Sequence, residues 1–297
     1  MRTKHVPRYL FRAWSATSGG GCRCATNNKS RIMPHLYMPT ITPLTRRIRR
    51  FYDLNEAILL QMAQSHFDQE TGFMSGFSSW ASSLHLVLCY AQSMALHTDP
   101  HIAVIDTCEL DVEVLVWHCP HLIGIGYEEY LAWGPIQGRG YKTVRFVDLL
   151  RCGVTHLFPQ LRDRSYREKG DVLQFGNECR SRCFGRTPVQ LTPSKIKAAE
   201  DIATLFGGLF LPVFVALLCL ETRSWYKARS DDVIDVGLMD HLSRVIERKG
   251  LSRELEVLHG GNWLRPGQVD TTNFPDVQQW IGLLRALVRR RKLTKSE

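Results

Sequence analysis

The chain has 297 residues, of which 44% are hydrophobic, and a formal net charge of +9. This length and composition are ordinary for a globular chain, so they predict one or two domains and exclude a small disulfide-stabilised scaffold. The nine cysteines are odd in number, and no apolar signal segment begins the chain. We therefore expect reduced thiols and a cytoplasmic or nuclear location.

The charges are strongly segregated along the chain. Residues 1–50 hold eleven Lys and Arg residues and no acid, whereas residues 51–138 hold eleven acids and no Lys or Arg. Such asymmetry can indicate a nucleic-acid or membrane surface, or two surfaces that attract each other or simply face water. We favour the interpretation that these charged segments attract each other or face water, and we expect neither nucleic acid nor a membrane as a partner. The basic start also resembles a mitochondrial presequence in composition, but residues 9–14 look like a folded strand.

The first half of the chain combines short strands with few helices. A helix is predicted over Leu54–Phe67 with Asn55 as its cap, and another follows the strand-like residues 73–78. The remaining strand-like runs are rich in β-branched and aromatic residues and are bounded by polar turns. They are residues 9–15, 101–108, 113–118, 127–136 and 141–150. This order predicts an α+β domain over residues 1–157.

Beyond this domain the composition changes twice. Residues 158–193 are polar and Arg-rich and predict a linker or long loop, and residues 194–297 predict a helical domain. Residues 203–220 are uncharged, which approaches the length of a membrane span. Because Gly207 and Pro212 interrupt this segment, we expect a buried, Pro-broken helix or helix pair instead.

Capping signals place the helices of the second half. Ser194 is expected to open the first helix, and Ser230 is expected to cap a later helix that Gly250 ends. A final helix is predicted from Asp276, with an apolar stripe that contains Trp280.

No metal site is expected. The pairs Cys22/Cys24 and Cys179/Cys183 could supply four zinc ligands, but neither has the two-residue gap of a zinc knuckle. Neither an HExxH sequence nor a phosphate-binding glycine loop occurs.

Three short motifs stand in a characteristic order. Arg12 lies in LFRAWS, Ser78 and Ser79 lie in FSSWASS, and Glu129 precedes Gly134 by five residues in EYLAWGPI. This order resembles the cholera-toxin-like group of the ADP-ribosyltransferase fold. It is also similar to a family of uncharacterised fungal proteins with LFR-W-S, FSSWxSS and EYLxxGxI segments. The likeness covers about residues 8–157 and implies a split sheet of short strands, followed here by a mainly α-helical C-terminal region.

The resemblance implies that the domain acts on NAD. Cleaving nicotinamide from ribose passes through an oxocarbenium-like transition state, which a carboxylate stabilises. By resemblance, Glu129 is the catalytic carboxylate and Arg12 meets the pyrophosphate or an adenosine phosphate. Ser78 and Ser79 orient the nicotinamide ribose, and Tyr127 or Trp80 is a candidate for stacking on a ring. All of these side chains are expected around one pocket.

The sequence departs from the group at one informative position. Where arginine-modifying members carry Glu or Gln, two residues before the catalytic Glu, this chain has Tyr127. Transfer to another acceptor, including a protein, hydrolysis of NAD, or a binding cleft without chemistry all stay open. The alternative function is therefore a non-catalytic interaction protein that retains the fold as a binding module; the sequence indicates no oligomeric state.

Each candidate residue also has a purely structural interpretation. Arg12 can serve in a surface ion pair, and Glu129 can simply face water from an amphipathic strand. Ser78 and Ser79 can cap the helix that follows them.

Overall fold

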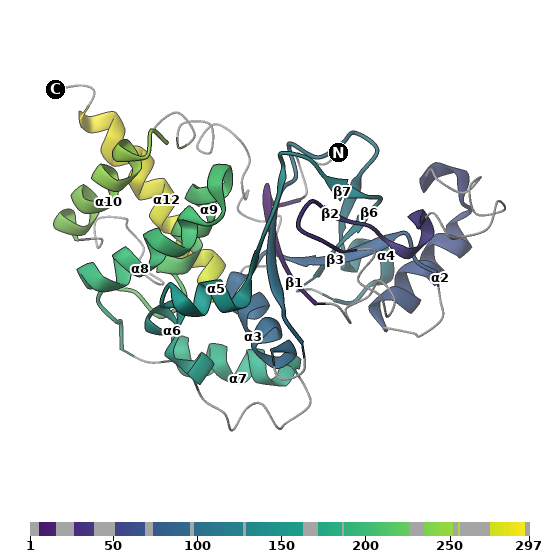
Figure 1. Ribbon diagram of the computed structural model, residues 1–297, viewed down its shortest axis with the longest axis horizontal. Coiled ribbons are helices and arrows are strands. Elements are labelled where there is room, and N and C mark those ends of the chain that lie inside the picture. The colour runs from purple at the N-terminus through teal and green to yellow at the C-terminus, as the bar shows by residue number, and fades with distance from the viewer. Residues whose placement is uncertain are drawn as a thin grey trace. The chain divides into compact units, whose positions relative to one another are not determined.

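The computed structural model describes most of the chain, and its elements are drawn in Figure 1. The described residues are 6–15, 27–38, 51–68, 74–95, 98–126, 129–162, 172–185, 187–225, 235–251, 255 and 274–294. The chain forms two compact units. The first comprises residues 1–82 and 94–146, and the second comprises residues 83–93 and 147–297.

The first unit is built on an antiparallel sheet. In the described residues, six strands pair in the order β5-β6-β3-β1-β4-β8, and β2 and β7 form a separate two-stranded sheet. The strands are β1 (Tyr9–Trp14), β2 (Arg31–Ile32), β3 (Phe77–Ala81), β4 (His101–Asp106), β5 (Leu115–His118), β6 (Glu129–Trp133), β7 (Ile136–Gln137) and β8 (Tyr141–Arg145). Together with the helices of the second unit, this sheet makes the protein an α+β protein, as predicted.

Alternation along the strands creates an apolar core on each face of the sheet. One cluster, here the Trp80 core, contains Trp80 together with Leu10, Trp14 and Tyr130. The other, here the Trp133 core, is formed by eight buried residues. They are Leu36, Leu54, Met62, Ala63, Phe77, Cys119, Leu131 and Trp133. Both faces are therefore buried around β3 and β6, which explains why apolar residues on these strands face both sides of the sheet.

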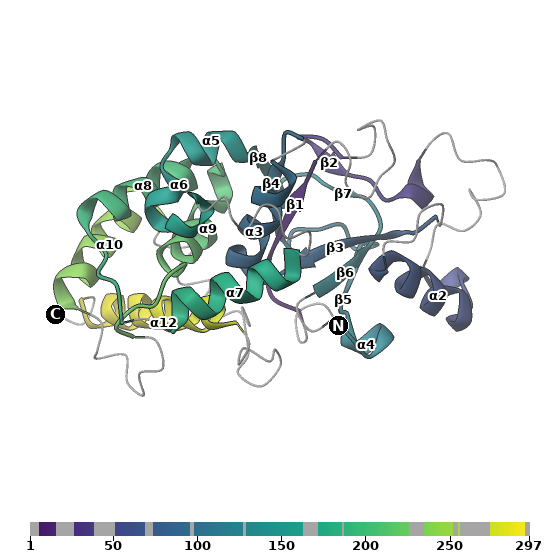
Figure 2. The ribbon, with the colours of Figure 1, turned by 90° about the horizontal axis from the view of Figure 1, so that it is seen from below.

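Short helices cover the Trp133 core. They are η1 (His35–Tyr37), η3 (Phe51–Asp53), α2 (Glu56–Phe67) and α4 (Pro120–Ile123). The helix α2 begins as predicted, because the side chain of Asn55 accepts a hydrogen bond from the backbone N–H of Ile58 over 2.9 Å. α2 and α4 lie side by side in both views (Figure 1 and Figure 2). This packing directs one face of α2 onto the sheet beside β3.

The serine motif lies in a strand, not at its end. We expected a strand near residues 73–78, but β3 runs from Phe77 to Ala81. Ser78 and Ser79 are therefore strand residues, and Ser83 occupies the helix corner. Ser83 accepts from the backbone N–H of Leu86 over 3.1 Å, so the capping role of serine belongs to it.

The second unit is helical. Its elements are α3 (Leu84–Met94), α5 (Phe146–Arg151), α6 (Val154–Leu157), η4 (Pro159–Arg162), α7 (Val172–Phe184), α8 (Pro193–Thr204), η6 (Gly207–Leu209), α9 (Phe210–Leu218), α10 (Val236–Arg248) and α12 (Pro275–Thr294). α3 and α5 each have one end residue in the first unit. α12 packs against both α9 and α10 (Figure 2).

The segment expected to be a linker or long loop contains a helix. α7 lies within residues 158–193, and the buried positions on it include Gly176, Cys179, Arg180 and Cys183. These positions are spaced as on one helical face. The pattern escaped prediction because Gly, Cys and Arg replace the usual aliphatic residues.

The uncharged segment, residues 203–220, is largely buried as expected but holds only the end of α8, followed by η6 and α9. The helix breaks at Gly207, whereas Pro212 lies in the first turn of α9 and does not break it. Every residue of α9 is buried. Thr192, rather than Ser194, caps α8, since its hydroxyl accepts from the backbone N–H of Lys195. Within the described part of the chain, no helix has both the length and the apolar character that a membrane span requires.

The start of α10 differs from expectation, whereas its end matches. Asp235 caps α10 by accepting from the backbone N–H of Leu238 over 2.8 Å, while Ser230 lies outside the described residues. Gly250 follows this helix with φ of 68°, a conformation that glycine adopts readily.

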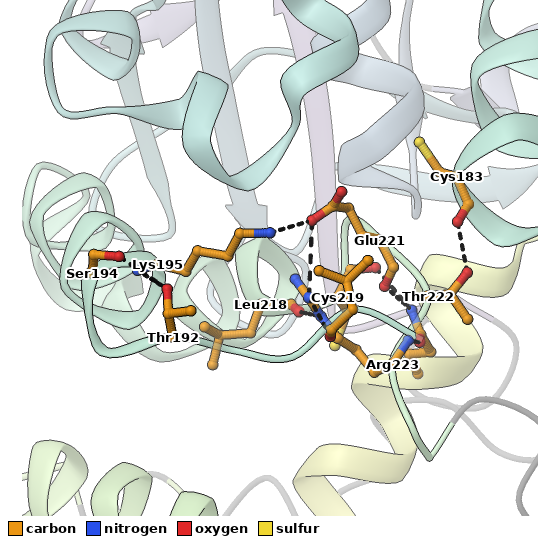
Figure 3. Close-up of polar contacts among 11 residues, drawn as sticks. Cys183, Thr192, Ser194, Lys195, Leu218, Cys219, Glu221, Thr222 and Arg223 are labelled. Atoms are coloured by element: carbon orange, nitrogen blue, oxygen red, sulfur yellow. Dashed lines mark hydrogen bonds and ion pairs between the residues drawn. The ribbon is translucent and has the colours of Figure 1, made fainter. Parts of the chain in front are cut away.

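A buried polar network closes the end of α9 (Figure 3). Arg223, which is fully buried, donates from Nε to the carbonyl oxygen of Leu218 over 2.7 Å. Gln279 on α12 donates from Nε2 to the carbonyl oxygens of Cys219 and Glu221, each over 3.0 Å. Because these carbonyls have no partner within their own helix, the network stabilises the turn that follows α9.

Candidate functional site

The strand register places Glu129 and Ser79 on one face of the sheet. Phe11 pairs with Ala81, and Ala81 pairs with Glu129, so these three positions form one row across β1, β3 and β6. Directly paired residues of antiparallel strands share a face, as do residues two apart. Ser79 therefore lies on the same face as Glu129, which is the face of the Trp133 core.

Arg12 lies on the opposite face of the sheet from Glu129, contrary to the expectation that all of these side chains surround one pocket. Its guanidinium nevertheless reaches the backbone of β3. The described register between β1 and β3 consists of the single pair Phe11↔Ala81, whereas β1 and β4 pair over six positions. Next to this single pair, Arg12 donates a hydrogen bond from Nη1 to the carbonyl oxygen of Ser79 over 2.7 Å. A continued ladder would place Ala13 opposite Ser79, so the guanidinium bonds where strand pairing stops.

His66 joins the site from α2. Its Nε2 lies 2.9 Å from the hydroxyl oxygen of Ser79, within hydrogen-bonding distance. Both side chains are half-buried. Ser79 therefore contacts Arg12 through its carbonyl and His66 through its hydroxyl, which fixes both its backbone and its side chain.

The backbone of Glu129 is held on both sides. Its N–H donates to the carbonyl oxygen of Gly126 over 3.0 Å, and its own carbonyl accepts from the N–H of Cys119 over 2.9 Å. The Glu129 side chain is half-buried. The carboxylate thus stands at the start of β6, on the face that carries Ser79.

Burial and charge set the protonation states of the cluster. Burial lowers the pKa of the Arg12 guanidinium to about 10, and the charge of Glu129 partly opposes this effect. Burial, followed by the charges of Arg12 and His35, lowers the pKa of His66 to about 3. Burial, followed by the charge of Glu129, raises the pKa of the Cys119 thiol to about 12. At neutral pH the cluster holds a cationic Arg12, a neutral imidazole and a neutral thiol.

The other predicted site residues are placed differently. Ser78 is 2% exposed on the Trp80 face, where it accepts from Trp80 Nε1 over 2.9 Å. Its hydroxyl is thus engaged inside the protein, on the opposite face from Ser79. Trp80 is likewise buried in that core. Tyr127 lies outside the described residues.

Sequence patterns did not identify His66 as a site residue. Its contact with Ser79 requires the register of β3, which sequence patterns placed several residues too early. A half-buried position near the end of an amphipathic helix that faces a serine-rich strand is the signal that could have found it.

The arrangement can bind a polar, hydroxyl-rich or cationic group. Glu129 supplies negative charge, and Ser79 supplies a hydroxyl that can donate and accept hydrogen bonds. The positive charge of the nearby Arg12 guanidinium makes the electrostatic potential less negative on the side of β1. Within the described ranges, His, Cys, Asp and Glu form no group of three that could hold a metal ion.

Comparison with protein families gives one match. Residues 5–139 match a family described as a domain of unknown function, DUF7587. The matched segment runs from before β1 to after β7 and so contains Arg12, His66, Ser79 and Glu129. No curated protein and no solved structure matches the chain.

Proposed function

We propose that the first unit is an ADP-ribosyltransferase-like domain that binds NAD and breaks its nicotinamide–ribose bond. The observation that supports this proposal most directly is the shared face of Glu129 and Ser79, beside the Arg12 guanidinium bound to Ser79. A carboxylate, a hydroxyl and a permanent cation are the groups that a cationic sugar, its hydroxyls and its phosphates require.

In this reaction Glu129 is the catalytic residue. The bond between C1′ of ribose and the nicotinamide nitrogen breaks, and its electron pair leaves with neutral nicotinamide. The Glu129 carboxylate stabilises the positive charge that develops on the ribose. Water then attacks C1′ and loses a proton, which yields ADP-ribose, or a nucleophilic acceptor takes the place of water.

The remaining residues position the sugar and the strand. Ser79 hydrogen-bonds a ribose hydroxyl, which holds the glycosidic bond near Glu129. Arg12 is 9% exposed, so its role is to hold β3 and to provide a positive field for phosphate rather than to form a wide contact. Ser78 has no direct part in this arrangement.

A binding module without chemistry is the second candidate, and one observation favours it. Two of the residues that the resemblance assigns to NAD, Arg12 and Ser78, are buried and bonded to protein atoms. A domain that keeps these residues for stability would retain the fold and bind a partner through its surface.

The decisive experiment measures nicotinamide release from NAD over hours with purified full-length protein. We expect wild-type turnover and a loss of at least about hundredfold in the Glu129→Gln variant, because the amide keeps the shape but removes the charge. Glu113→Gln is the matched control, since Glu113 is an exposed carboxylate of the same unit. It should release nicotinamide at the wild-type rate.

The binding of NAD, measured by calorimetry, separates the two candidates. Binding without release in the wild-type protein would support the binding module. Neither binding nor release would contradict NAD as the ligand, and equal release by the wild type and Glu129→Gln would contradict Glu129 as the catalytic residue.

A further inference from the structure

The contact between His66 and Ser79 has a role that the proposed reaction leaves unassigned. The two residues come from different elements, α2 and β3, and their polar atoms are 2.9 Å apart. The α2 helix is fixed at its start by Asn55, and its residues Met62 and Ala63 are buried in the Trp133 core. His66 is therefore delivered to Ser79 by a helix that is anchored independently of any ligand.

We propose that His66 is a positioning residue that fixes the direction of the Ser79 hydroxyl toward the ligand bound beside Glu129. This inference rests on the proposed function. A serine hydroxyl rotates freely unless a partner selects one direction, because its single proton can point along any of several staggered positions. The imidazole occupies one hydrogen-bonding direction of Ser79 Oγ and leaves the others for a ribose hydroxyl.

The surroundings of His66 favour positioning over proton transfer. A general base needs a pKa near the working pH, and burial, with a smaller contribution from the nearby Arg12 guanidinium, lowers the pKa of this imidazole and keeps it a weak base. The groups that face it are Arg12 from β1, His35 from η1, and Ser79 and the ring of Phe77 from β3. A neutral imidazole can hold the hydroxyl over the whole physiological pH range without changing its own charge.

The test compares two substitutions of His66 in the full chain. His66→Phe removes the hydrogen bond, and we expect kcat for nicotinamide release to fall about tenfold while KM changes less. His66→Asn offers an amide in a similar place and should recover most of the rate. The dependence of kcat on pH should keep the wild-type shape in both variants, because His66 does not titrate between about pH 5 and pH 8.

Other outcomes would overturn the inference. If His66→Phe loses the fall of kcat at acidic pH that the wild type shows, His66 is a general base. If kcat is unchanged in His66→Phe, His66 has no role in the reaction. The nitrogen chemical shifts of the His66 imidazole, followed by NMR, give a readout that needs no NAD turnover. They should stay those of a neutral ring from about pH 5 to pH 8 and should change in Ser79→Ala.

The two readouts separate the failure of each proposal. If the nitrogen chemical shifts of the His66 imidazole do not change in Ser79→Ala, the positioning role is wrong even when NAD is cleaved. If the NMR result is as expected but the wild-type protein neither binds nor cleaves NAD, the proposed function fails, and positioning toward NAD is rejected with it.

Discussion

Trp80 donates a hydrogen bond from its indole Nε1 to the hydroxyl oxygen of Ser78 inside an apolar core. The same hydroxyl lies 3.4 Å from the carbonyl oxygen of Ala132. The neighbouring Ser79 points to the other face of β3 and is half-buried. Two adjacent serines thus have separable roles, one in stability and one in the candidate site.

Ser78→Ala should therefore destabilise the protein more than Ser79→Ala. The first change leaves the buried indole N–H of Trp80 without a partner, which costs about 1–3 kcal/mol. The second removes a half-exposed hydroxyl, so we expect a change within about 1 kcal/mol. Urea denaturation followed by tryptophan fluorescence measures both. Equal losses of stability would contradict the separation, as would a greater loss of nicotinamide release per folded molecule in Ser78→Ala.

Gly76→Ala should disturb the Trp133 core. A Cβ atom at residue 76 would lie 2.4 Å from Cζ3 of Trp133, and the Trp133 ring is nearly fully buried. Overpacking of this kind lowers the free energy of unfolding by about 1–3 kcal/mol. Gly208→Ala is the matched control, because a Cβ there meets no described atom within 4 Å. A Gly76→Ala variant as stable as Gly208→Ala would show that Trp133 moves aside without cost.

Breaking the buried ion pair between Arg8 and Asp106 should destabilise the first unit. Arg8 donates from Nε and Nη2 to the Asp106 carboxylate, with Nη2 2.7 Å from Oδ2. The Asp106 side chain is 5% exposed. Although burial opposes the charged form, hydrogen bonding to Asp106 raises the pKa of Arg8.

Asp106→Asn should lower the free energy of unfolding by about 3 kcal/mol, since it leaves the Arg8 charge partly buried and unpaired. Asp99→Asn provides the comparison, because Asp99 forms an exposed ion pair with Arg145. That change should cost less than about 1 kcal/mol. Thermal unfolding of the wild type and the two variants in the same buffer compares their stabilities. Equal Tm values for Asp106→Asn and Asp99→Asn would contradict a larger role for the buried ion pair.

Asp276 should make the second unit less stable as pH rises. Burial raises the pKa of this carboxyl, against the opposing charge of Arg180 and the hydrogen bond from Ser83. The folded protein therefore holds the Asp276 proton more tightly than the unfolded chain does. Above the pKa of the unfolded aspartate, the free energy of unfolding falls until the pH passes the folded pKa.

Asp276→Asn removes this titration while its amide oxygen can still accept from the Ser83 hydroxyl. We expect the stability of the wild type relative to this variant to decline as the pH rises above about 4, the pKa of an unfolded aspartate. Urea midpoints at several pH values measure the difference. A constant difference would mean that Asp276 stays in one protonation state throughout, and a rising difference would reverse the sign of its pKa shift.

Local signals predicted the elements that depend on them. The Asn55 cap and the apolar spacing that follows it lie within a few residues of each other, so the start of α2 could be read directly. The interruption between α8 and α9 falls at Gly207, as its local signal predicted. Pro212 was expected to break the helix too, but a proline in the first turn of a helix is tolerated, and α9 runs through it.

Elements that depend on distant partners were harder to predict. The bounds of β3 are fixed by its pairing with β6, some fifty residues later, so the serines shifted from a helix corner into a strand. The buried face of α7 consists of Gly, Cys and Arg residues instead of aliphatic ones, so the sequence pattern does not indicate a helix there. Its burial is seen only once the second unit is packed.

The candidate site shows the same division. Arg12 on β1 and Glu129 on β6 were placed on strands by local pattern, but their faces depend on registers that sequence alone does not supply. His66 was missed for that reason. The bond from Arg12 to the carbonyl of Ser79 could not be predicted either, since it forms where the ladder between two strands stops.

The chain passes three times between its two units, because residues 83–93 belong with the C-terminal helices although strands of the sheet precede and follow them. No single protease cut can therefore release either unit intact. A fragment that stops at residue 139 would carry α3 without α7, whose Gly176 lies against Leu86, and without Asp276 of α12, which accepts a hydrogen bond from Ser83. The buried side chain of Leu86 would lose this cover, so such a fragment should be less soluble than the whole chain.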